Sequence, residues 1–281
     1  MSFNMATKYN TFKVVTDDEE YNSLPEFASD IEQPIDANDN HPMFPVSRTP
    51  VTHKNVVLHN YLVRSAQCLT LAEKRILMYG IAKIGGINQD IKISAMDYAE
   101  AYDLELNTAY EQLKDSANKL RSRFLSWQIK DGRKIGVRNT QWLQGYDYYD
   151  KEGYVKFRFS SYVHEYLFDL YQEFTKYQLK QACALRSIHS WRLLELFEMM
   201  KCNKKNGWLK IDIEEFYHAM EAKESYKQNF SLLRQYVIEP AVKELMTKDN
   251  WEIEWRTIKR ARKVIMLEFA FERSPQGDLF K

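Results

Sequence analysis

The chain has 281 residues, 44% of them hydrophobic, which is enough for about two domains that each bury a core. Its formal net charge of +1 conceals an asymmetry: residues 1–50 carry nine acidic and three basic side chains, which leaves +7 on the remainder and favours a polyanionic partner. Three scattered cysteines and the lack of any apolar run of membrane-spanning length exclude a disulfide framework and a transmembrane segment, so we expect a cytoplasmic protein with no membrane partner.

Residues 1–54 are expected to form a mostly disordered acidic arm. They contain five of the seven prolines, and they show no sustained helical or strand periodicity. Such a segment buries too little apolar surface to offset the entropy that ordering removes. An arm that a partner orders remains the alternative, because Phe12, Tyr21 and Phe44 could serve as anchors.

The first folded unit is predicted over residues 55–160. Thr70 and Glu73 form the pattern of a capping box, and Asp131-Gly132 is the preferred two-residue hairpin turn. The nine residues 145–153 are expected to form a loop. The predicted elements are an extended lead-in (56–63), a helix (70–84), a strand (91–93), a helix (95–101), a helix (107–124), a hairpin (127–137) and a strand (154–159).

Residues 161–184 are predicted to form a helical connector, because their aromatic residues recur at helical spacing. The second unit follows over 185–272, and 273–281 form a flexible tail. Ser225-x-x-Gln228 matches a capping box that would open a long helix, which Pro240 should kink near Tyr236. The predicted elements of this unit are a helix (187–202), a strand (209–211), a helix (213–219), the long helix (225–245) and two strands (251–256 and 264–271).

One phrase occurs in both units. Ile91–Ala101 and Leu209–Ala219 both match [IL]-K-I-[SD]-x-x-[DE]-[YF]-x-x-A, 118 residues apart. Each copy begins with the alternation of a short strand and continues into a helix that Ser94 or Asp212 would cap. Chance could produce two such joints, but the surrounding elements also agree. We therefore interpret the chain as two copies of one small domain.

Helix, strand, helix, second helix and basic-tipped ribbon is the order of a winged helix. The predicted fold is α+β, with two tandem winged-helix domains whose second helices could enter the major groove of DNA. The second domain is richer in amide and guanidinium groups and is assigned more of the base reading. The expected DNA-binding residues are Asn107, Thr108, Lys114, Arg133, Lys134 and Arg138 in the first domain, and Ser225, Lys227, Gln228, Asn229, Arg234, Lys259, Arg260, Arg262 and Lys263 in the second.

The sequence contains no catalytic motif that we could recognise. It has no G-x-x-x-x-G-K-[ST] phosphate loop, no H-E-x-x-H metal pair and no G-x-S-x-G elbow, and its six histidines are isolated. We therefore predict a protein that is not an enzyme and that needs no cofactor or metal. Surface charge that serves only solubility remains an alternative for the basic loops.

Two phrases near the starts of the units carry a family resemblance. They are Asn60-x-Leu62-x-Arg64-Ser65-Ala66 followed by Leu69-Thr70-x-x-Glu73-Lys74-Arg75, and Leu185-Arg186-Ser187-x-x-Ser190-x-Arg192-Leu193-x-Glu195-Leu196. They resemble the two winged-helix domains of replication initiators of theta-replicating, iteron-containing bacterial plasmids, over residues 56–272. His189 and Leu194 replace tyrosines that are usual in the family, and Ala261 replaces a common glycine.

The resemblance implies a plasmid replication initiator. Such a protein binds repeated origin sites as a monomer, promotes opening of the duplex, recruits host replication proteins such as the helicase, and represses its own synthesis as a homodimer formed through the first domain. A winged-helix transcriptional repressor without a role in replication is the alternative function, and a DNA-nicking enzyme is a less favoured one.

The tail resembles the peptide that docks on the bacterial sliding clamp. It contains Gln-x-Asp-Leu-Phe, in which Gln276 would enter a polar pocket and Leu279 and Phe280 an apolar one. A frayed terminus that happens to end in hydrophobic residues is the alternative, because short linear motifs recur by chance.

Overall fold

The computed structural model describes residues 50–86, 88–131, 134–168, 174–201 and 206–274. Most of the acidic arm, the clamp-like tail with Gln276, Leu279 and Phe280, and Arg133 therefore lie outside the described residues. The described residues between 50 and 127 and between 138 and 274 belong to one compact body. The other part of the chain comprises Met1–Arg48 and Gln128–Val137, and its described residues are the strand tips 128–131 and 134–137.

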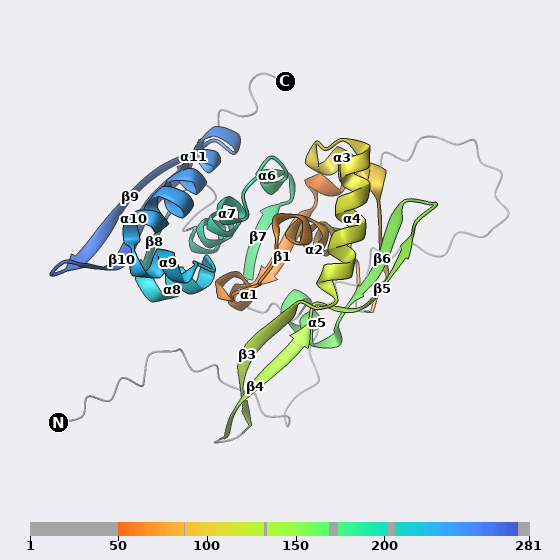
Figure 1. Cartoon of the computed structure of the whole chain (residues 1–281), viewed down its shortest axis with the longest axis horizontal. Coiled ribbons are helices and arrows are strands. Elements are labelled where there is room, and N and C mark those ends of the chain that lie inside the picture. The colour runs from red at the N-terminus through yellow and green to blue at the C-terminus, as the bar shows by residue number, and fades with distance from the viewer. Residues whose placement is uncertain (1–49, 87, 132–133, 169–173, 202–205, 275–281) are drawn as a thin grey trace, which may run out of the picture. The chain divides into compact units, whose positions relative to one another are not determined.

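The first winged-helix domain has the predicted helices and a three-stranded sheet (Figure 1). The antiparallel sheet has the order β2-β6-β5, so the last strand lies in the middle. Its elements are α2 (Leu71–Lys83), β2 (Ile91–Ser94), α3 (Ala95–Tyr102), α4 (Leu106–Leu120), β5 (Leu143–Tyr149) and β6 (Tyr154–Phe159).

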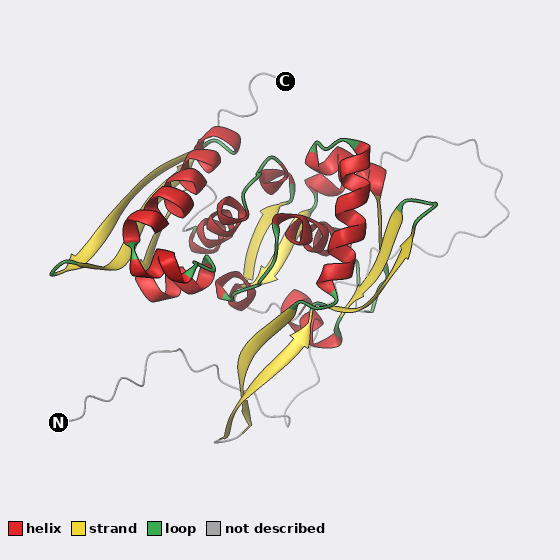
Figure 2. Ribbon diagram, viewed as in Figure 1, coloured by secondary structure: helices red, strands yellow, loops and turns green. Residues whose placement is uncertain are grey.

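The second domain repeats this topology. Its antiparallel sheet has the order β8-β10-β9, again with the last strand in the middle, and its helices lie to one side of the sheet (Figure 2). Its elements are α7 (Ile188–Met200), β8 (Asn206–Asp212), α8 (Ile213–Ala219), α9 (Glu224–Gln228), α10 (Phe230–Leu233), the π turn η2 (Arg234–Ile238), α11 (Glu239–Lys248), β9 (Trp251–Arg260) and β10 (Lys263–Arg273). The α+β fold with two winged helices is thus confirmed.

The N-caps of the repeated phrase form as expected. Ser94 accepts a hydrogen bond from the backbone N–H of Asp97, and Asp212 accepts one from that of Glu214. Side-chain oxygens at these positions satisfy N–H groups that the first turn of a helix leaves without a partner. Each short strand therefore ends where its helix begins.

The wing of the first domain differs from the prediction. By topology, β5 and β6 are the counterparts of β9 and β10, so residues 143–149, partly predicted as a loop, form a strand. The register shifts between Leu143 and Gly145, and beyond this bulge Tyr146 and Tyr148 are half-buried in alternation with exposed neighbours. The predicted hairpin exists, as β3 (Phe124–Asp131) and β4 (Lys134–Gln141), but it is a separate two-stranded ribbon.

The connector was predicted to be helical, but it also contains a strand. Between α5 (Ser161–Phe168) and α6 (Lys180–Cys183) lies β7 (Phe174–Gln178), which pairs with β1 (Asn55–His59). Thr175 and Tyr177 are buried and alternate with exposed residues, which is the period of a strand. The 3₁₀ turn Val51–His53 and helix α1 (Asn60–Arg64) flank β1.

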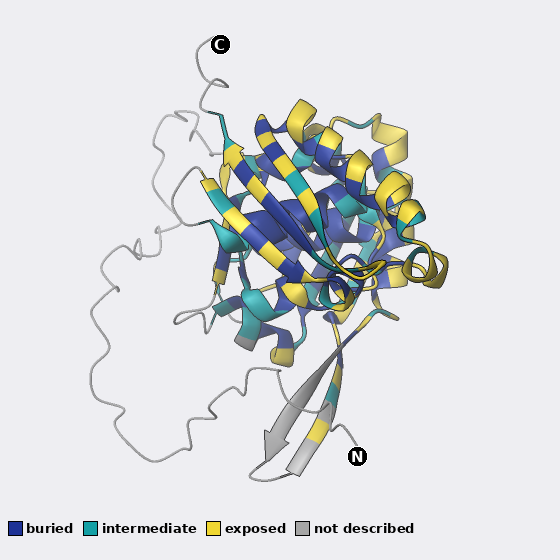
Figure 3. Ribbon diagram, turned by 90° about the vertical axis from the view of Figure 1, so that its left-hand side faces the viewer, coloured by how far each residue is buried: buried dark blue, intermediate teal, exposed yellow. Residues whose placement is uncertain are grey.

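Large aromatic side chains fill the core of the body. Trp142, Trp191 and Trp251 are fully buried, and Phe197 stacks on Phe271 at 4.2 Å between ring centroids. Figure 3 shows buried and exposed segments alternating along the strands, as expected for sheets with one face packed on helices. Among the described residues, no helix is long and apolar enough to cross a bilayer.

Candidate DNA interface

The long helix of the second domain, predicted over 225–245, begins later than predicted, at Phe230. The chain breaks at Asn229, which has an extended backbone, and the side chain of Asn229 caps the following helix by accepting a hydrogen bond from Ser231 N–H at 3.0 Å. Ser225, Lys227 and Gln228 therefore lie on the separate short helix α9. Ser225-x-x-Gln228 matched the capping-box pattern, but the N-cap of α9 is Lys223, which makes no side-chain cap bond.

A π turn interrupts the helix after α10. It covers Arg234–Ile238 and closes with a hydrogen bond from Glu239 N–H to the Arg234 carbonyl, five residues apart. Pro240 follows at the second position of α11 and has no N–H for the Tyr236 carbonyl. The predicted irregularity near Tyr236 thus takes the form of a π turn. Such turns often occur at functional sites.

The π turn leaves three consecutive side chains exposed, those of Arg234, Gln235 and Tyr236. The Arg234 guanidinium pairs with Glu239 at 2.6 Å and lies 5.9 Å from the centroid of the Trp255 ring. Tyr236 is 54% exposed, and its ring stacks on that of Tyr226 at 6.2 Å. Arg234 and Tyr236 thus remain exposed while each contacts another side chain of the domain.

Arg234 was among the predicted DNA-binding residues, whereas its exposed neighbours Gln235 and Tyr236 were not. The signal was available, because both residues lie within the turn that Pro240 disturbs. Figure 1 shows α10 and α11 end to end beside β9 and β10. The exposed side of this helix and the turn that joins the two strands belong to the same domain.

The wing of the second domain has a basic tip. Lys259, Arg260, Arg262 and Lys263 are all exposed, and none forms an ion pair within the described part of the chain. Ala261 has a φ of 55°, the left-handed conformation that tight hairpin turns require. The four cations are thus free to meet an anionic surface such as a phosphate backbone.

The corresponding surface of the first domain has a mixed charge. Asn107 and Thr108 are exposed in the first turn of α4, as predicted. Lys114 pairs with Asp150 in the β5–β6 turn at 2.9 Å, and this hydrogen bond raises the pKa of Lys114. Its ammonium is therefore already engaged by the wing.

The ribbon β3–β4 carries the other predicted contacts of the first domain. The Arg138 guanidinium lies 4.5 Å from the centroid of the Tyr162 ring, so part of its side chain packs within the body. Nothing is described for the side chain of Lys134. Among the described residues, no group of three or more His, Cys, Asp or Glu side chains could hold a metal ion.

Comparisons with known proteins agree with this architecture. The family model described as the initiator replication protein WH1 domain matches residues 55–198, and that of the initiator Rep protein WH2 domain matches 212–271. A crystal structure of the Pi initiator protein in complex with iteron DNA is similar, with a TM-score of 0.68 and 21% identity over 80% of this chain and 99% of that chain. No curated protein sequence matches.

A second solved structure covers part of the chain. It is the crystal structure of the WH1 domain of MSBI1.176, a replication protein isolated from a multiple sclerosis patient. The identity is 27%, the match covers 40% of this chain and 89% of that chain, and the TM-score is 0.35.

Proposed function

Because this chain belongs to the family of initiator replication proteins, we propose that it binds repeated sites at a plasmid origin and starts replication there without catalysing a reaction. The observation that carries the proposal is the second domain, where the helix of residues 230–248, which we call the reading helix, accompanies a wing with four exposed cations at its tip. A helix of this kind fits the major groove, while cations on a wing suit the neighbouring phosphates. Opening of the duplex and recruitment of host replication proteins would follow binding.

The second domain is proposed to read most of the sequence. Arg234 and Gln235 are suited to bidentate contacts with guanine and adenine, and the Tyr236 ring could contact a thymine methyl group. Lys227, Gln228 and Ser225 on α9 lie just before the helix and would contact the adjoining backbone or base edges. The tip cations would bind phosphates and supply the salt-dependent part of the affinity.

The first domain is proposed to make a second, weaker contact through Asn107 and Thr108, and to form the homodimer that represses expression. Its helix α4 presents Glu111 and Asp115 as well as lysines, so it offers less attraction to phosphates than the second domain. Arg133, Lys134 and Arg138 on the ribbon would add cations to this contact. We therefore propose the same division of functions that the sequence predicts: residues 55–160 serve dimerisation and DNA contact, and residues 185–272 read most of the DNA sequence.

Selection of bound duplexes from a random pool tests the reading function. Wild-type protein should select a defined site, and alanine in place of Gln228, Arg234 or Tyr236 should relax preference at individual base pairs by about 1–3 kcal/mol each. Lys176→Ala, an exposed change on β7, is the control and should leave the preference unaltered. Unchanged preferences in all three variants would show that neither α9 nor the reading helix lies in the groove.

Origin opening separates the proposal from its alternatives. An initiator should make thymines of a supercoiled origin reactive to permanganate, whereas a winged-helix transcriptional repressor would leave them protected. A nicking enzyme would convert supercoiled DNA with Mg²⁺ into relaxed circles.

For the proposed sliding-clamp contact, removal of residues 276–281 should abolish clamp binding in calorimetry, and unchanged affinity would end that part of the proposal.

A further inference from the structure

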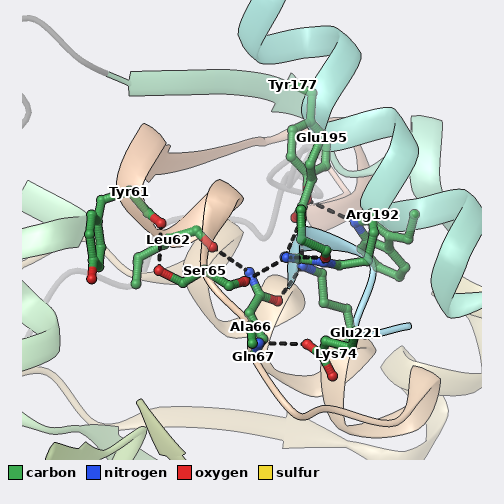
Figure 4. A network of polar contacts seen from close by, with 12 residues as sticks. Tyr61, Leu62, Ser65, Ala66, Gln67, Lys74, Tyr177, Arg192, Glu195 and Glu221 are labelled. Carbon is green, nitrogen blue, oxygen red and sulfur yellow. Dashed lines mark hydrogen bonds and ion pairs between the residues drawn. The ribbon is translucent and has the colours of Figure 1, made fainter. Parts of the chain in front are cut away.

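A segment of the first domain is bound by side chains of the second. The segment is Ser65–Cys68, between α1 and α2, and Arg192 of α7 reaches it (Figure 4). The Arg192 guanidinium donates to the Ser65 carbonyl at 2.6 Å and to the Ala219 carbonyl at 2.7 and 2.9 Å. One buried side chain thus joins the backbone of the first domain to the end of α8.

Glu221 also binds this segment. Its Oε1 accepts hydrogen bonds from the backbone N–H groups of Gln67 at 2.6 Å and Cys68 at 2.8 Å. Cys68 and Glu221 both have a positive φ, of 52° and 51°, which is a costly conformation for residues other than glycine. The contacts between the two turns hold both backbones in conformations that they would not prefer alone.

Further bonds surround this clasp, by which we mean Arg192 and Glu221 with the segment Ser65–Cys68. Arg64 pairs with Glu215 of α8 at 2.8 Å. Inside the body, the Lys74 ammonium donates to Gln67 and to Glu195, each at 2.7 Å, and Lys74 and Glu195 are completely buried. Because buried polar groups tolerate few arrangements, the two domains are held in one defined contact.

The part of the clasp that belongs to the second winged helix, at Ala219 and Glu221, shortly precedes the reading helix in the chain. Helix α8 ends at Ala219, and the turn through Glu221 leads into α9 and then into the capped helix at Phe230. Both bonded groups, the Ala219 carbonyl and the Glu221 carboxylate, belong to that turn. The position of the reading helix relative to the first domain is therefore set at its point of entry.

We propose that Arg192 and Glu221 are positioning residues that fix the spacing between the two DNA segments contacted by the two winged helices. The inference rests on the proposed function, in which both domains contact DNA. Inserting one base pair between the two segments shifts one relative to the other by about 3.4 Å and about 35°. A rigid protein loses one of its two contacts on such a duplex, whereas a protein with a loosened clasp can follow the DNA.

The experiment measures affinity against spacing. Duplexes with the selected site carry zero, one or two base pairs inserted between the two segments that wild-type protein protects from hydroxyl radicals, and binding is followed by fluorescence anisotropy at one salt concentration. For wild-type protein, one inserted pair should weaken binding at least about tenfold. For Glu221→Ala and Arg192→Met the penalty should shrink to less than about threefold.

Two variants control the comparison. Glu221→Gln keeps an oxygen that accepts from Gln67 and Cys68, so it should retain the wild-type penalty. Glu252→Ala removes an exposed carboxylate from β9 with the same charge change, and it should also behave as wild type. Glu221 is only half-buried, so Glu221→Ala should fold even if Arg192→Met does not, and faster amide exchange at Gln67 and Cys68 would report the open clasp directly.

A wild-type spacing penalty in Glu221→Ala would overturn the inference. So would an equal loss of affinity on every duplex, because that result indicates general destabilisation. If wild-type protein protects a single segment or none, the proposed two-domain contact itself fails, and this outcome is seen before any variant is made.

Discussion

Lys74 is a lysine without access to solvent, and its charge is balanced inside the protein. The ammonium contacts Glu195 at 2.7 Å, and burial lowers the pKa of Lys74 to about 8 although Glu195 opposes the shift. Lys74→Met would leave the buried Glu195 carboxylate with Arg192 at 3.5 Å and the Tyr177 hydroxyl. Because Arg192 still compensates that charge while Gln67 and Glu195 lose a buried donor, we expect the free energy of unfolding in urea at neutral pH to fall by about 1–3 kcal/mol.

A second substitution provides the control for this loss. Lys74→Met combined with Glu195→Gln also removes the carboxylate that lies 3.5 Å from the Arg192 guanidinium and leaves this buried cation without its ionic partner, so the double variant should be less stable than Lys74→Met alone. A single variant that loses less than about 1 kcal/mol would contradict the view that the pair is a mutually dependent buried unit.

His189 should make the protein sensitive to mild acid. Burial lowers the pKa of its imidazole below the ordinary 6.5, with Glu221 opposing, and within the described residues its Nδ1 has no hydrogen-bond partner. Below pH 6.5 the imidazole is protonated in the unfolded chain but stays neutral in the folded one, because its pKa is lower there. The stability due to neutral His189 is therefore present above pH 6.5 and is lost as the pH falls below it. The melting temperature of His189→Gln should fall less than that of wild type from pH 7.5 to 5.5, and parallel curves would refute this.

Substitutions of Asn229 can distinguish its role as a helix cap from a role in DNA contact. Its side chain caps the reading helix through Ser231 N–H. Asn229→Ala should lower the free energy of unfolding by about 1 kcal/mol, whereas Asn229→Asp should keep the cap and the stability. If Asn229 also lies near DNA, as predicted, the aspartate should weaken binding by repulsion from phosphates; equal stability of all three proteins would contradict the cap.

Local signals were sufficient for some elements and not for others. The capped joints at Ser94 and Asp212 depend on neighbouring residues, and they form as predicted. Strand β7 forms by pairing with the distant strand β1, so residues near it in the sequence do not predict it. The hydrogen bond from the Thr175 hydroxyl to the Asn60 side chain likewise joins residues 115 positions apart. The wing of the first domain was misplaced because Asp131-Gly132 is a stronger hairpin signal than the turn between β5 and β6.

In the folded protein, the two sequence phrases of the family resemblance, at 60–75 and 185–196, lie in contact with each other. Lys74 of the first pairs with Glu195 of the second, and Arg192 of the second donates to the Ser65 carbonyl of the first. Their arrangement could not be predicted, because a resemblance says which residues recur and not what they touch. Glu221 lies outside both phrases, and its role follows from the backbone that it binds.

The second domain should dominate the electrostatics of binding. Each phosphate contact adds about 0.9 to the negative slope of log K against log salt concentration. Lys259→Ala with Arg262→Ala removes two exposed cations from the wing tip, so the slope should become shallower by about 1.8. Lys176→Ala with Lys248→Ala removes two exposed lysines elsewhere in the body and should leave the slope unaltered. Anisotropy titrations at several NaCl concentrations decide between specific phosphate contacts and general charge attraction, because the latter predicts the same change for both pairs.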